Sequence, residues 1–533
     1  REPAHRAFPK LIEDWDIERI ITDFADAAER MKVGGMDGIE LQVYGHLLDQ
    51  FWSPLTNDLV GPYGADTLEN RMRFPMDVLG AIRKRVGSVF IVGFRNTADE
   101  AQKGGITAED GLKISKTLAD TGQLDFLNVV RGRIHTDPAM TDLIPIQGMK
   151  NAPHLDFAGQ VKKLTGMPTF HAAKIPDVAT ARHAVEAGLL DMVGMTRAQI
   201  SDPDLVRKLI EGRPQDIRPC VGANLCIAQA MASRPIRCIH NPMTGREAAW
   251  GDAVPTDSPR NVTVIGGGPA GLEAARVAAG RGHHVTLYEA SDDLGGQLAL
   301  WAQAPMTREF RKTLAWYRTQ LTQLQVRVHT GKRLTPEDIA VLDADALILA
   351  TGATAAMPAS KATGPDTIPV IDPWQAIAGD PTGKHILIND EGGGRAALSA
   401  ADALLDNNRI TLVTAEYAIG ELVTPTVRAP VYRRLLAGGA VMHPSQEIHA
   451  ITGRTVTLRS VHTGEETRIE DIDIAVANVF GAIDVVDTKA VPQHNTVRAS
   501  ATSDAVVPCA ARQRVIACIA IQRIAASIAR QNV

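Results

Sequence analysis

Apolar side chains in the N-terminal part of the chain switch repeatedly between a helical and a strand spacing. Over residues 17–31 they recur every three or four positions, which predicts an amphipathic helix with Asp16 as its N-cap. A short apolar run at 38–43 then predicts a strand. The same pair recurs, with helices expected over 69–86, 108–120, 154–165 and 178–188 and strands at 89–94, 124–130, 168–172 and 192–195. This alternation predicts parallel βα units.

The number of these strands does not by itself settle the architecture. Five of them precede Cys220. A closed (β/α)8 barrel needs eight strands and about 250 residues, whereas an open doubly wound sheet needs fewer. The pattern alone leaves both architectures open.

A glycine-rich turn opens a second series of βα units. A strand expected at 261–265 leads into Gly266, Gly268 and Gly271, a Gly-x-Gly-x-x-Gly pattern followed by a helix and a strand that ends at Glu289. Such glycines allow a tight turn, close approach of the backbone to a pyrophosphate and close helix packing, and the acid accepts from a ribose hydroxyl. We therefore predict a dinucleotide site here.

A second glycine-rich turn follows a strand expected at 385–389. Asp390 and Glu391 precede its glycines, where a phosphate would require positive potential. A relic of the fold without bound nucleotide and a working nicotinamide site both remain open. Proline-containing stretches at 252–259 and 354–374 are interpreted as linkers.

Three cysteines lie close together between these regions. Cys220, Cys226 and Cys238 have a spacing that suits an iron–sulfur cluster, and Ala223 stands where a C-x2-C-x2-C run would place another thiolate. Three thiolates suit a 3Fe-4S cluster, or a 4Fe-4S cluster whose remaining ligand is His240 or water. The alternatives are inert thiols or an adventitious zinc site.

Composition narrows the class of protein. The chain has 533 residues, of which 45% are hydrophobic and 22% charged, and this excludes wholesale disorder. The net charge of −5 argues against nucleic-acid binding, and the longest apolar stretches are too short for a membrane span. No signal peptide or disulfide framework is evident. We expect a cytoplasmic protein of several domains.

Both ends of the chain are unusual. It begins at Arg1 and has no methionine before Met31. Residues 481–533 contain neither leucine nor glutamate, although these are among the commonest residues. We expect a fragment whose tail is out of frame or not native, with an alanine-rich terminal helix as the alternative. Cys509 and Cys518 lie in this tail and are given no role.

One segment carries a specific family resemblance. Residues 44–54 (Tyr-Gly-His-Leu-Leu-Asp-Gln-Phe-Trp-Ser-Pro), with Asn57, 63–64 and 68–71, resemble the old yellow enzyme family of FMN-dependent (β/α)8 barrels. The order of barrel, cysteines and dinucleotide domain resembles the branch of trimethylamine dehydrogenase and 2,4-dienoyl-CoA reductase. The residues at 44–54 and around Cys220 are most similar to those of dimethylglycine and N-methylproline demethylases. The resemblance covers residues 17–475.

The resemblance implies a domain order and an incomplete barrel. The segment at 38–46 would be the fourth barrel strand, so we expect the chain to be N-terminally truncated. The expected parts are a partial FMN-binding TIM barrel with the C-terminal five βα units (1–218), an iron–sulfur segment and linker (219–258), a Rossmann-like FAD/ADP-binding domain (259–378), a second NAD(P)-type domain (379–480) and the aberrant tail (481–533).

The resemblance also implies which residues hold the cofactors. Arg95 would lie beside the N1/O2 edge of the flavin, where a cation stabilises the anionic reduced form. The FMN phosphate would be held at Ala173, Lys174, Thr196 and Arg197. FAD or ADP would be held at Gly266, Gly268, Gly271, Glu289, Gly296 and Gln297.

Tyr44 and His46 match the positions that face substrate over the flavin. A Tyr–His pair suits an amine, because hydride leaves the methyl carbon only if the nitrogen is unprotonated and either side chain can hold that proton. Arg131 and Arg133 follow another strand end, and we predict that one of them binds a substrate carboxylate. The alternatives are a buried ring for Tyr44, a helix cap for His46 and solvent or phosphate contacts for the arginines.

Three functions are weighed. The preferred one is oxidative demethylation of a small N-methylated amine or amino acid, with electrons passing from FMN through the cluster to an electron-transfer protein. The second is NAD(P)H-dependent reduction of an enoyl or dienoyl thioester, against which the acids at Asp390 and Glu391 count. The third is an inactive gene remnant. A homo-oligomer is expected in the first two cases.

Overall fold

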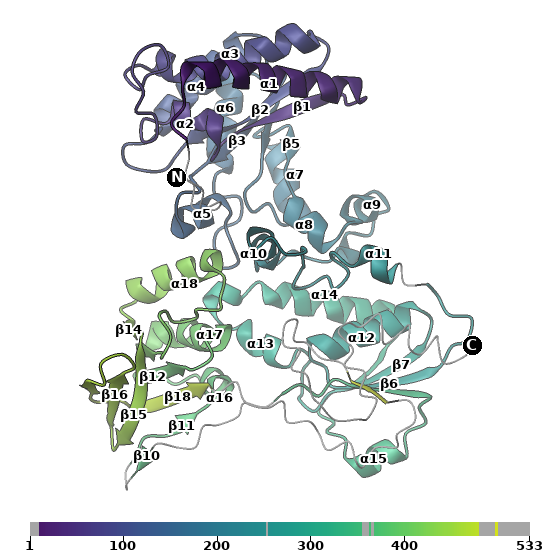
Figure 1. Ribbon diagram of the computed structural model, residues 1–533. Coiled ribbons are helices and arrows are strands. Elements are labelled where there is room, and N and C mark those ends of the chain that lie inside the picture. Colours follow the sequence, from purple (N-terminus) through teal and green to yellow (C-terminus); the bar gives the residue numbers. More distant parts are fainter. Residues whose placement is uncertain (1–9, 252–253, 354–361, 364–366, 479–495, 499–533) are drawn as a thin grey trace. The chain divides into compact units, whose positions relative to one another are not determined.

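The structure is a computed structural model that describes all residues except 1–9, 252–253, 354–361, 364–366, 479–495 and 499–533. It divides into two compact units, Arg1–Ala198 and Gln199–Val533, each of which is considered by itself (Figure 1). The five-part division expected from the sequence is finer than this and stays a prediction.

The first unit is built on one parallel sheet. Its strands are β1 (Gly38–Val43), β2 (Ile91–Asp99), β3 (Phe126–Arg131), β4 (Thr169–His171) and β5 (Met192–Val193), hydrogen-bonded in that order. Each neighbouring pair is parallel. The prediction of five parallel βα units is confirmed.

Helices connect the strands of this sheet. They are α1 (Asp14–Val33), α2 (Leu47–Trp52), α3 (Leu68–Val86), α4 (Ala108–Asp120), α5 (Asp137–Leu143), α6 (Leu155–Thr165), α7 (Val178–Glu186) and α8 (Thr196–Ser201), which runs on into the second unit. The N-cap of α1 is Glu13, and Asp16 lies inside the helix as the reciprocal partner of a capping box, so the assignment of Asp16 as the cap was wrong. Both acids can accept from the same helix start, and the sequence does not distinguish them.

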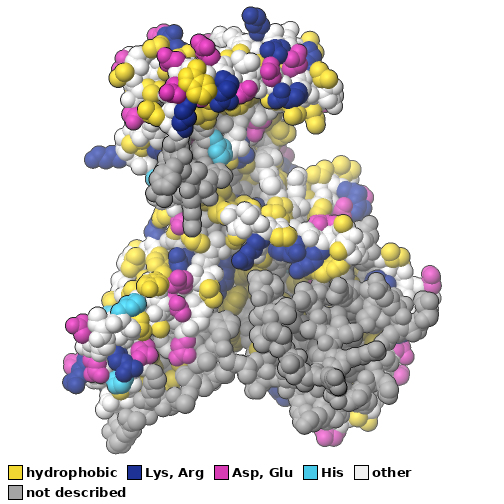
Figure 2. Space-filling model, in the orientation of Figure 1, with side chains coloured by type: hydrophobic (Ala, Val, Ile, Leu, Met, Phe, Trp, Pro, Cys, Tyr) yellow, Lys and Arg dark blue, Asp and Glu magenta, His cyan; other side chains and the backbone are white. Residues whose placement is uncertain are grey.

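The register of the sheet separates a buried face from a polar one. Leu41, Phe94, Leu127 and Thr169 pair across the sheet, and all four are buried, the first three in the core that the helices share. The next row consists of Gln42, Arg95, Asn128 and Phe170, none of which is fully buried. Because successive side chains alternate between faces, this second row lies on the opposite face. Figure 2 shows acidic and basic side chains interspersed on the visible surface of this unit, without a basic footprint.

The second unit begins with short helices and a parallel sheet. The helices are α9 (Leu205–Ile210), η1 (Pro214–Asp216), α10 (Leu225–Met231) and α11 (Glu247–Trp250). The sheet has the order β19-β9-β6-β7-β8, with β6 (Asn261–Ile265), β7 (His284–Tyr288), β8 (Arg327–His329), β9 (Ala346–Leu349) and β19 (Thr496–Arg498). Its connecting helices are α12 (Pro269–Gly280), α13 (Gln297–Trp301), η2 (Pro305–Thr307), α14 (Phe310–Gln323) and α15 (Pro336–Ala340). The predicted strand–glycine turn–helix–strand unit is present.

A second nucleotide-type sheet and a small antiparallel sheet follow. The former has the order β11-β18-β12-β13-β14 and the latter β10-β15-β16-β17. The strands are β10 (Ala362–Thr363), β11 (Val370–Ile371), β12 (His385–Asp390), β13 (Arg409–Val413), β14 (Val441–His443), β15 (Gln446–Thr452), β16 (Thr455–Ser460), β17 (Glu466–Ile469) and β18 (Ile474–Asn478). The helices are α16 (Pro373–Gly379), α17 (Arg395–Leu404), η3 (Leu405–Asn407) and α18 (Pro425–Ala437).

The sequence also led to expectations about the tail and about membrane-spanning segments. Apart from β19, the tail at 481–533 lies outside the described residues. Among the helices that the structure does describe, none has the length and apolar character needed to cross a membrane.

Candidate functional site

Tyr44 and Arg95 come together from two neighbouring strands of the first sheet, β1 and β2. Tyr44 directly follows β1, and the Arg95 guanidinium on β2 lies 4.8 Å from the centre of its ring. The Nε atom of Arg95 is buried and has no hydrogen-bond partner within the described part of the chain. A buried donor of this kind needs an acceptor that the protein does not supply. The polar edge of a flavin would fit, so the residues present are compatible with bound FMN.

His46 lies beside this pair at the start of a helix. Its ring centre is 6.4 Å from that of Tyr44, and His46 is the N-cap residue of α2. The structure therefore bears out the helix-cap position. A substrate-facing role for Tyr44 and His46 stays a prediction.

Asp49 is a functional candidate that sequence reasoning passed over. Its carboxylate accepts from the backbone N–H groups of Gly45 at 2.5 Å and His46 at 3.0 Å. Burial raises the pKa of Asp49 to about 6. A charged residue among the apolar side chains of α2 was the available signal.

Arg131 and Arg133 are each paired with a carboxylate at the end of β2, Asp99 as its last residue and Glu100 as the residue that follows. Arg131 donates from Nε to Asp99 at 2.7 Å, and its side chain is 37% exposed. Arg133 lies 3.2 Å from Glu100, and this pair is largely buried. Arg131 therefore keeps more of its guanidinium accessible than Arg133 does.

The predicted phosphate-binding residues follow the last two strands of the first unit. Ala173 and Lys174 are buried, and the Lys174 ammonium donates to the backbone carbonyl of Met149. Thr196 is exposed and begins α8, where Arg197 is partly buried. Lys174 is thus not a solvated surface charge, while binding of the FMN phosphate by these four residues stays a prediction.

The first glycine turn of the second unit has the geometry of a dinucleotide loop. Gly266 has a φ of +107°, and a Cβ at Gly271 would lie 1.8 Å from the Gly266 carbonyl oxygen, so neither tolerates a side chain. A Cβ at Gly268 would meet nothing within 4 Å, which leaves space at the helix start. The Glu289 carboxylate accepts from Gly267 N–H at 2.6 Å, which places the acid at the turn. These features fit the pyrophosphate and ribose of FAD or ADP.

Gly296 and Gln297 lie at the start of α13. Gly296 has a φ of +51°, and a Cβ there would approach the Cα of Gly268 to 3.3 Å. Gln297 donates to the carbonyl of Ala353 at 2.7 Å. Both residues therefore border the glycine turn, and their contact with a nucleotide stays a prediction.

Hydrogen bonds bring together the two ends of residues 219–240, the cysteine segment that carries Cys220, Cys226 and Cys238. The carbonyl of Pro219, which precedes Cys220, accepts from Nδ1 of His240 at 3.0 Å. The backbone N–H of His240 donates in turn to Sγ of Cys238 at 3.4 Å. Cys220 and Cys238 are therefore carried on adjoining stretches, although they are far apart in sequence.

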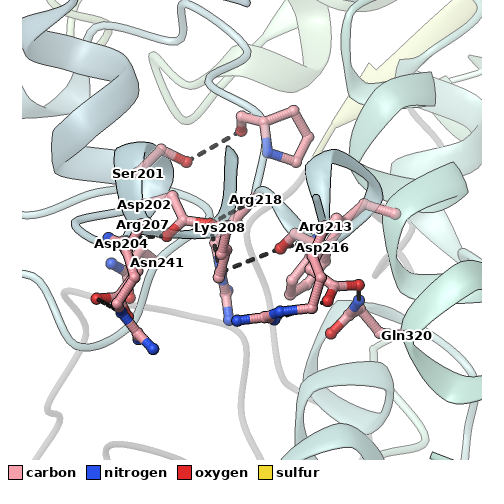
Figure 3. A network of polar contacts seen from close by, with 12 residues as sticks. Ser201, Asp202, Asp204, Arg207, Lys208, Arg213, Asp216, Arg218, Asn241 and Gln320 are labelled. Carbon is pink, nitrogen blue, oxygen red and sulfur yellow. Dashed lines mark hydrogen bonds and ion pairs between the residues drawn. The ribbon is translucent and has the colours of Figure 1, made fainter. Parts of the chain in front are cut away.

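A polar network fixes the chain just before Cys220 (Figure 3). The Asp202 carboxylate accepts from Lys208 Nζ at 2.6 Å and from the backbone N–H of Arg218 at 2.7 Å. Ser201 donates to the Pro219 carbonyl at 3.0 Å. Together with the His240 contact, these bonds hold the entry to the cysteine segment in place.

Arg218 also ties the cysteine segment to the first nucleotide domain. Its guanidinium lies 3.1 Å from the carboxylate of Glu273 on α12 and 4.4 Å from the ring centre of Trp316 on α14. Arg276 makes a second ion pair with Glu273 at 2.8 Å. Burial alone would raise the pKa of Glu273, but the two guanidinium groups hold it well below its usual range.

The segment that carries Cys220, Cys226 and Cys238 shows only some of the features expected of a metal site. These three cysteines are partly exposed and form no disulfide with one another, and among the described residues no three His, Cys, Asp or Glu side chains are grouped to hold a metal ion. His240 is buried, which lowers its pKa to about 3, and its Nδ1 is engaged by Pro219. An adventitious zinc site is not evident in the described residues. The iron–sulfur cluster itself stays a prediction.

Ala223 is a packed part of this segment. Its side chain joins an apolar cluster with Val221, Ala302 and Phe310, and its carbonyl lies 3.4 Å from the guanidinium of Arg395 on α17. The position at which a further cysteine was expected is thus filled by an apolar contact.

The second glycine turn carries its own carboxyl group. Asp390 ends β12 fully buried, and its Oδ2 accepts from Gly420 N–H at 2.6 Å. Leu422 N–H donates to the Gly393 carbonyl at 2.9 Å, so the loop after β13 packs on the glycine turn. Burial raises the pKa of Asp390. A nucleotide phosphate would have to displace this loop and approach a carboxyl group.

Comparisons with known proteins agree with this geometry. Residues 2–216 match the NADH:flavin oxidoreductase / NADH oxidase family, and residues 260–485 match the pyridine nucleotide-disulphide oxidoreductase family. Relatives include a probable N-methylproline demethylase of Rhizobium meliloti, 52% identical over 82% of this chain and 64% of that protein. An N,N-dimethylglycine/sarcosine dehydrogenase of Chromohalobacter salexigens is 39% identical over 88% of this chain and 70% of the relative.

A solved structure shows the same architecture. Histamine dehydrogenase from Rhizobium sp. 4-9 aligns with a TM-score of 0.80 at 25% identity, covering 88% of this chain and 70% of that one. The expected resemblance and the expected order of a barrel-type domain before a dinucleotide-type domain are both confirmed. The chain belongs to the NADH:flavin oxidoreductase / NADH oxidase family, and it carries a pyridine nucleotide-disulphide oxidoreductase domain behind its FMN-type domain.

Proposed function

We propose that this chain belongs to an enzyme that oxidatively demethylates a small N-methylated amine or amino acid, of the N-methylproline or dimethylglycine type. FMN held beside Tyr44, His46 and Arg95 would supply the hydride acceptor for the methyl C–H bond, and hydrolysis of the resulting substrate iminium would release formaldehyde and the demethylated amine. The two relatives named for such compounds support this substrate class.

The observation that carries the proposal is the grouping of Tyr44, Arg95 and His46. The guanidinium on the Tyr44 ring and the imidazole 6.4 Å away provide one cation and two side chains able to hold a proton. Arg95 stabilises negative charge on the reduced flavin edge. Tyr44 or His46 accepts the proton that must leave the substrate nitrogen before hydride transfer.

Arg131 is the better of the two candidates for a substrate carboxylate. Its Nε is engaged by Asp99 while its side chain is 37% exposed, so its outer nitrogens can reach a ligand. Arg133 is committed to buried Glu100. Arg131→Ala should therefore raise KM for an N-methyl amino acid and leave KM for trimethylamine unchanged, and Arg133→Ala should lower protein stability instead.

We propose that Cys220, Cys226 and Cys238 hold an iron–sulfur cluster. The hydrogen bonds through Pro219 and His240 that join two of the cysteine-bearing stretches support this assignment, as does the N–H bond to the Cys238 sulfur. Such a cluster would supply a one-electron route from the flavin to an electron-transfer protein. We further propose that the enzyme is a cytoplasmic homo-oligomer that binds FAD or ADP at the Gly266 turn.

The second glycine turn supports electron flow from the substrate through the flavin to an acceptor, rather than from NAD(P)H to the flavin. The buried Asp390 and the loop over Gly393 disfavour NAD(P)H at that turn, which counts against the enoate reductase alternative.

The test is anaerobic flavin absorbance of the intact protein, mixed separately with N-methylproline, dimethylglycine, trimethylamine and NADPH. We expect an N-methyl compound to bleach the flavin and release formaldehyde, and NADPH to leave it oxidised. Bleaching by NADPH alone would refute the demethylase proposal in favour of the reductase. No bleaching by any of the four would refute both.

A further inference from the structure

We propose that Asp49 is a positioning residue: its buried carboxylate holds the backbone of Gly45 and His46 and thereby keeps Tyr44 and His46 in place beside Arg95. The inference rests on the proposed function only in taking these two side chains to face substrate. The hold itself is a property of the protein alone.

The contacts of Asp49 are directed at the loop. Each carboxylate oxygen accepts one N–H from consecutive loop residues, Gly45 at 2.5 Å and His46 at 3.0 Å. Thr97 on β2 donates to the same carboxylate at 3.5 Å, near the limit for a hydrogen bond. Asp49 is only 7% exposed. One side chain thus connects the loop after β1 to the strand that carries Arg95.

The loop has little freedom to adopt another shape. Gly45 has a φ of +67°, and a Cβ there would lie 2.5 Å from Cδ1 of Ile134. The turn therefore requires glycine and packs directly against the segment after β3. With its backbone pinned on one side by Asp49 and packed on the other by Ile134, the loop presents Tyr44 and His46 in one arrangement.

The surroundings of Asp49 in the closed loop disfavour its negatively charged form. Burial raises its pKa to about 6, and the charge of nearby Glu100 adds to this rise, while the Gly45 N–H, Gln50 and Arg133 oppose it. Glu100 is itself fixed by Ser53 at 2.7 Å and by Arg133.

The sign of the pH effect follows from linkage. Opening the loop exposes Asp49 and returns its pKa toward 3.8. Ionised Asp49 therefore favours opening, and the closed loop is most stable below the unfolded pKa and loses that stability as pH rises through about 6. The opening equilibrium should increase about tenfold between about pH 5 and pH 8.

The test is amide hydrogen exchange of the peptide covering residues 44–52, corrected for the intrinsic pH dependence, in the intact protein without substrate. Wild type should lose about tenfold protection at Gly45 and His46 between about pH 5 and pH 8. Asp49→Asn should show exchange that no longer depends on pH, with slower flavin reduction. Asp77→Asn is the control, because Asp77 is an exposed carboxylate that accepts from Tyr63.

Three outcomes separate the possibilities. Wild-type protection that stays constant across this pH range, or an Asp49→Asn profile equal to that of wild type, would overturn the inference. The wild-type profile is informative even if the variant fails to fold. Failure of every N-methyl compound to reduce the flavin would refute the proposed function, whereas the exchange result would stand.

Discussion

Buried Glu273 lies between two cations, the buried Arg218 and the partly buried Arg276, and this arrangement predicts an unusual order of mutational effects. Its carboxylate is 3.1 Å from Arg218 and 2.8 Å from Arg276, and both guanidinium groups lie over Trp316, at 4.4 and 5.7 Å. Glu273→Gln leaves two cations over one ring without an anion. Arg276→Met leaves one cation and one anion, which still pair.

The magnitudes follow from this charge count. Removing the shared partner of a buried ion pair costs about 3–5 kcal/mol, because the remaining charge is uncompensated. Arg276→Met loses one charged hydrogen-bonded contact and a weak ring contact while the Arg218 pair persists, which we put at about 1–2 kcal/mol. Glu273→Gln should therefore be the more destabilising change by about 2 kcal/mol, although it alters fewer atoms.

The assay is thermal unfolding of the intact protein, with Glu337→Gln, an exposed glutamate of α15, as control. At about 2–4 °C per kcal/mol, the two variants should differ in Tm by roughly 4–8 °C. Because the pKa of Glu273 lies well below its usual range, its contribution is present above the unfolded pKa and is lost only in strong acid, so the order should hold from about pH 5 to pH 8. An equal or larger loss in Arg276→Met would refute the reasoning.

Three further predictions concern other parts of the chain. Ala223→Cys should complete a four-thiolate set and raise iron from about three to about four atoms per chain, measured by iron analysis and EPR; unchanged iron would argue against a vacant ligand position. Gly271→Ala, whose Cβ would lie 1.8 Å from Gly266 O, should lower the content of released FAD, whereas Gly280→Ala on the same helix, which meets nothing within 4 Å, should not. Burial lowers the pKa of His171 to about 4, so neutral His171 stabilises the first unit above its unfolded pKa, and about 2 kcal/mol is lost between about pH 8 and pH 5. His171→Gln should remove this pH dependence of Tm, and an unchanged pH dependence would contradict it.

Local patterns were sufficient for the βα units of the first unit and for the first glycine turn. The spacing of apolar residues identified all five strands of the first unit, because burial of one face imposes its period on the sequence. The glycines at 266, 268 and 271 predicted a dinucleotide turn, because only a residue without a side chain fits between strand and helix there. The helix cap was misplaced from Glu13 to Asp16, since both acids serve one capping box.

The charged contacts of the site depended on the tertiary structure. The sequence shows no partner for Arg131 and Arg133, yet Asp99 and Glu100 at the end of β2 pair with them. Arg95 meets Tyr44 because of the sheet register, which no local pattern encodes.

The sequence by itself determined the βα units of the first unit, the glycine turns and the family resemblance, because these depend on residues close together along the chain. Only the tertiary structure decided that Asp49 accepts from the loop after Tyr44, that Glu273 pairs with two arginines and that Asp390 accepts from Gly420 on another loop. The physical reason is that burial and charge pairing are set by neighbours in space. A carboxylate's energy depends on the donors and cations around it, and those come from other segments of the chain.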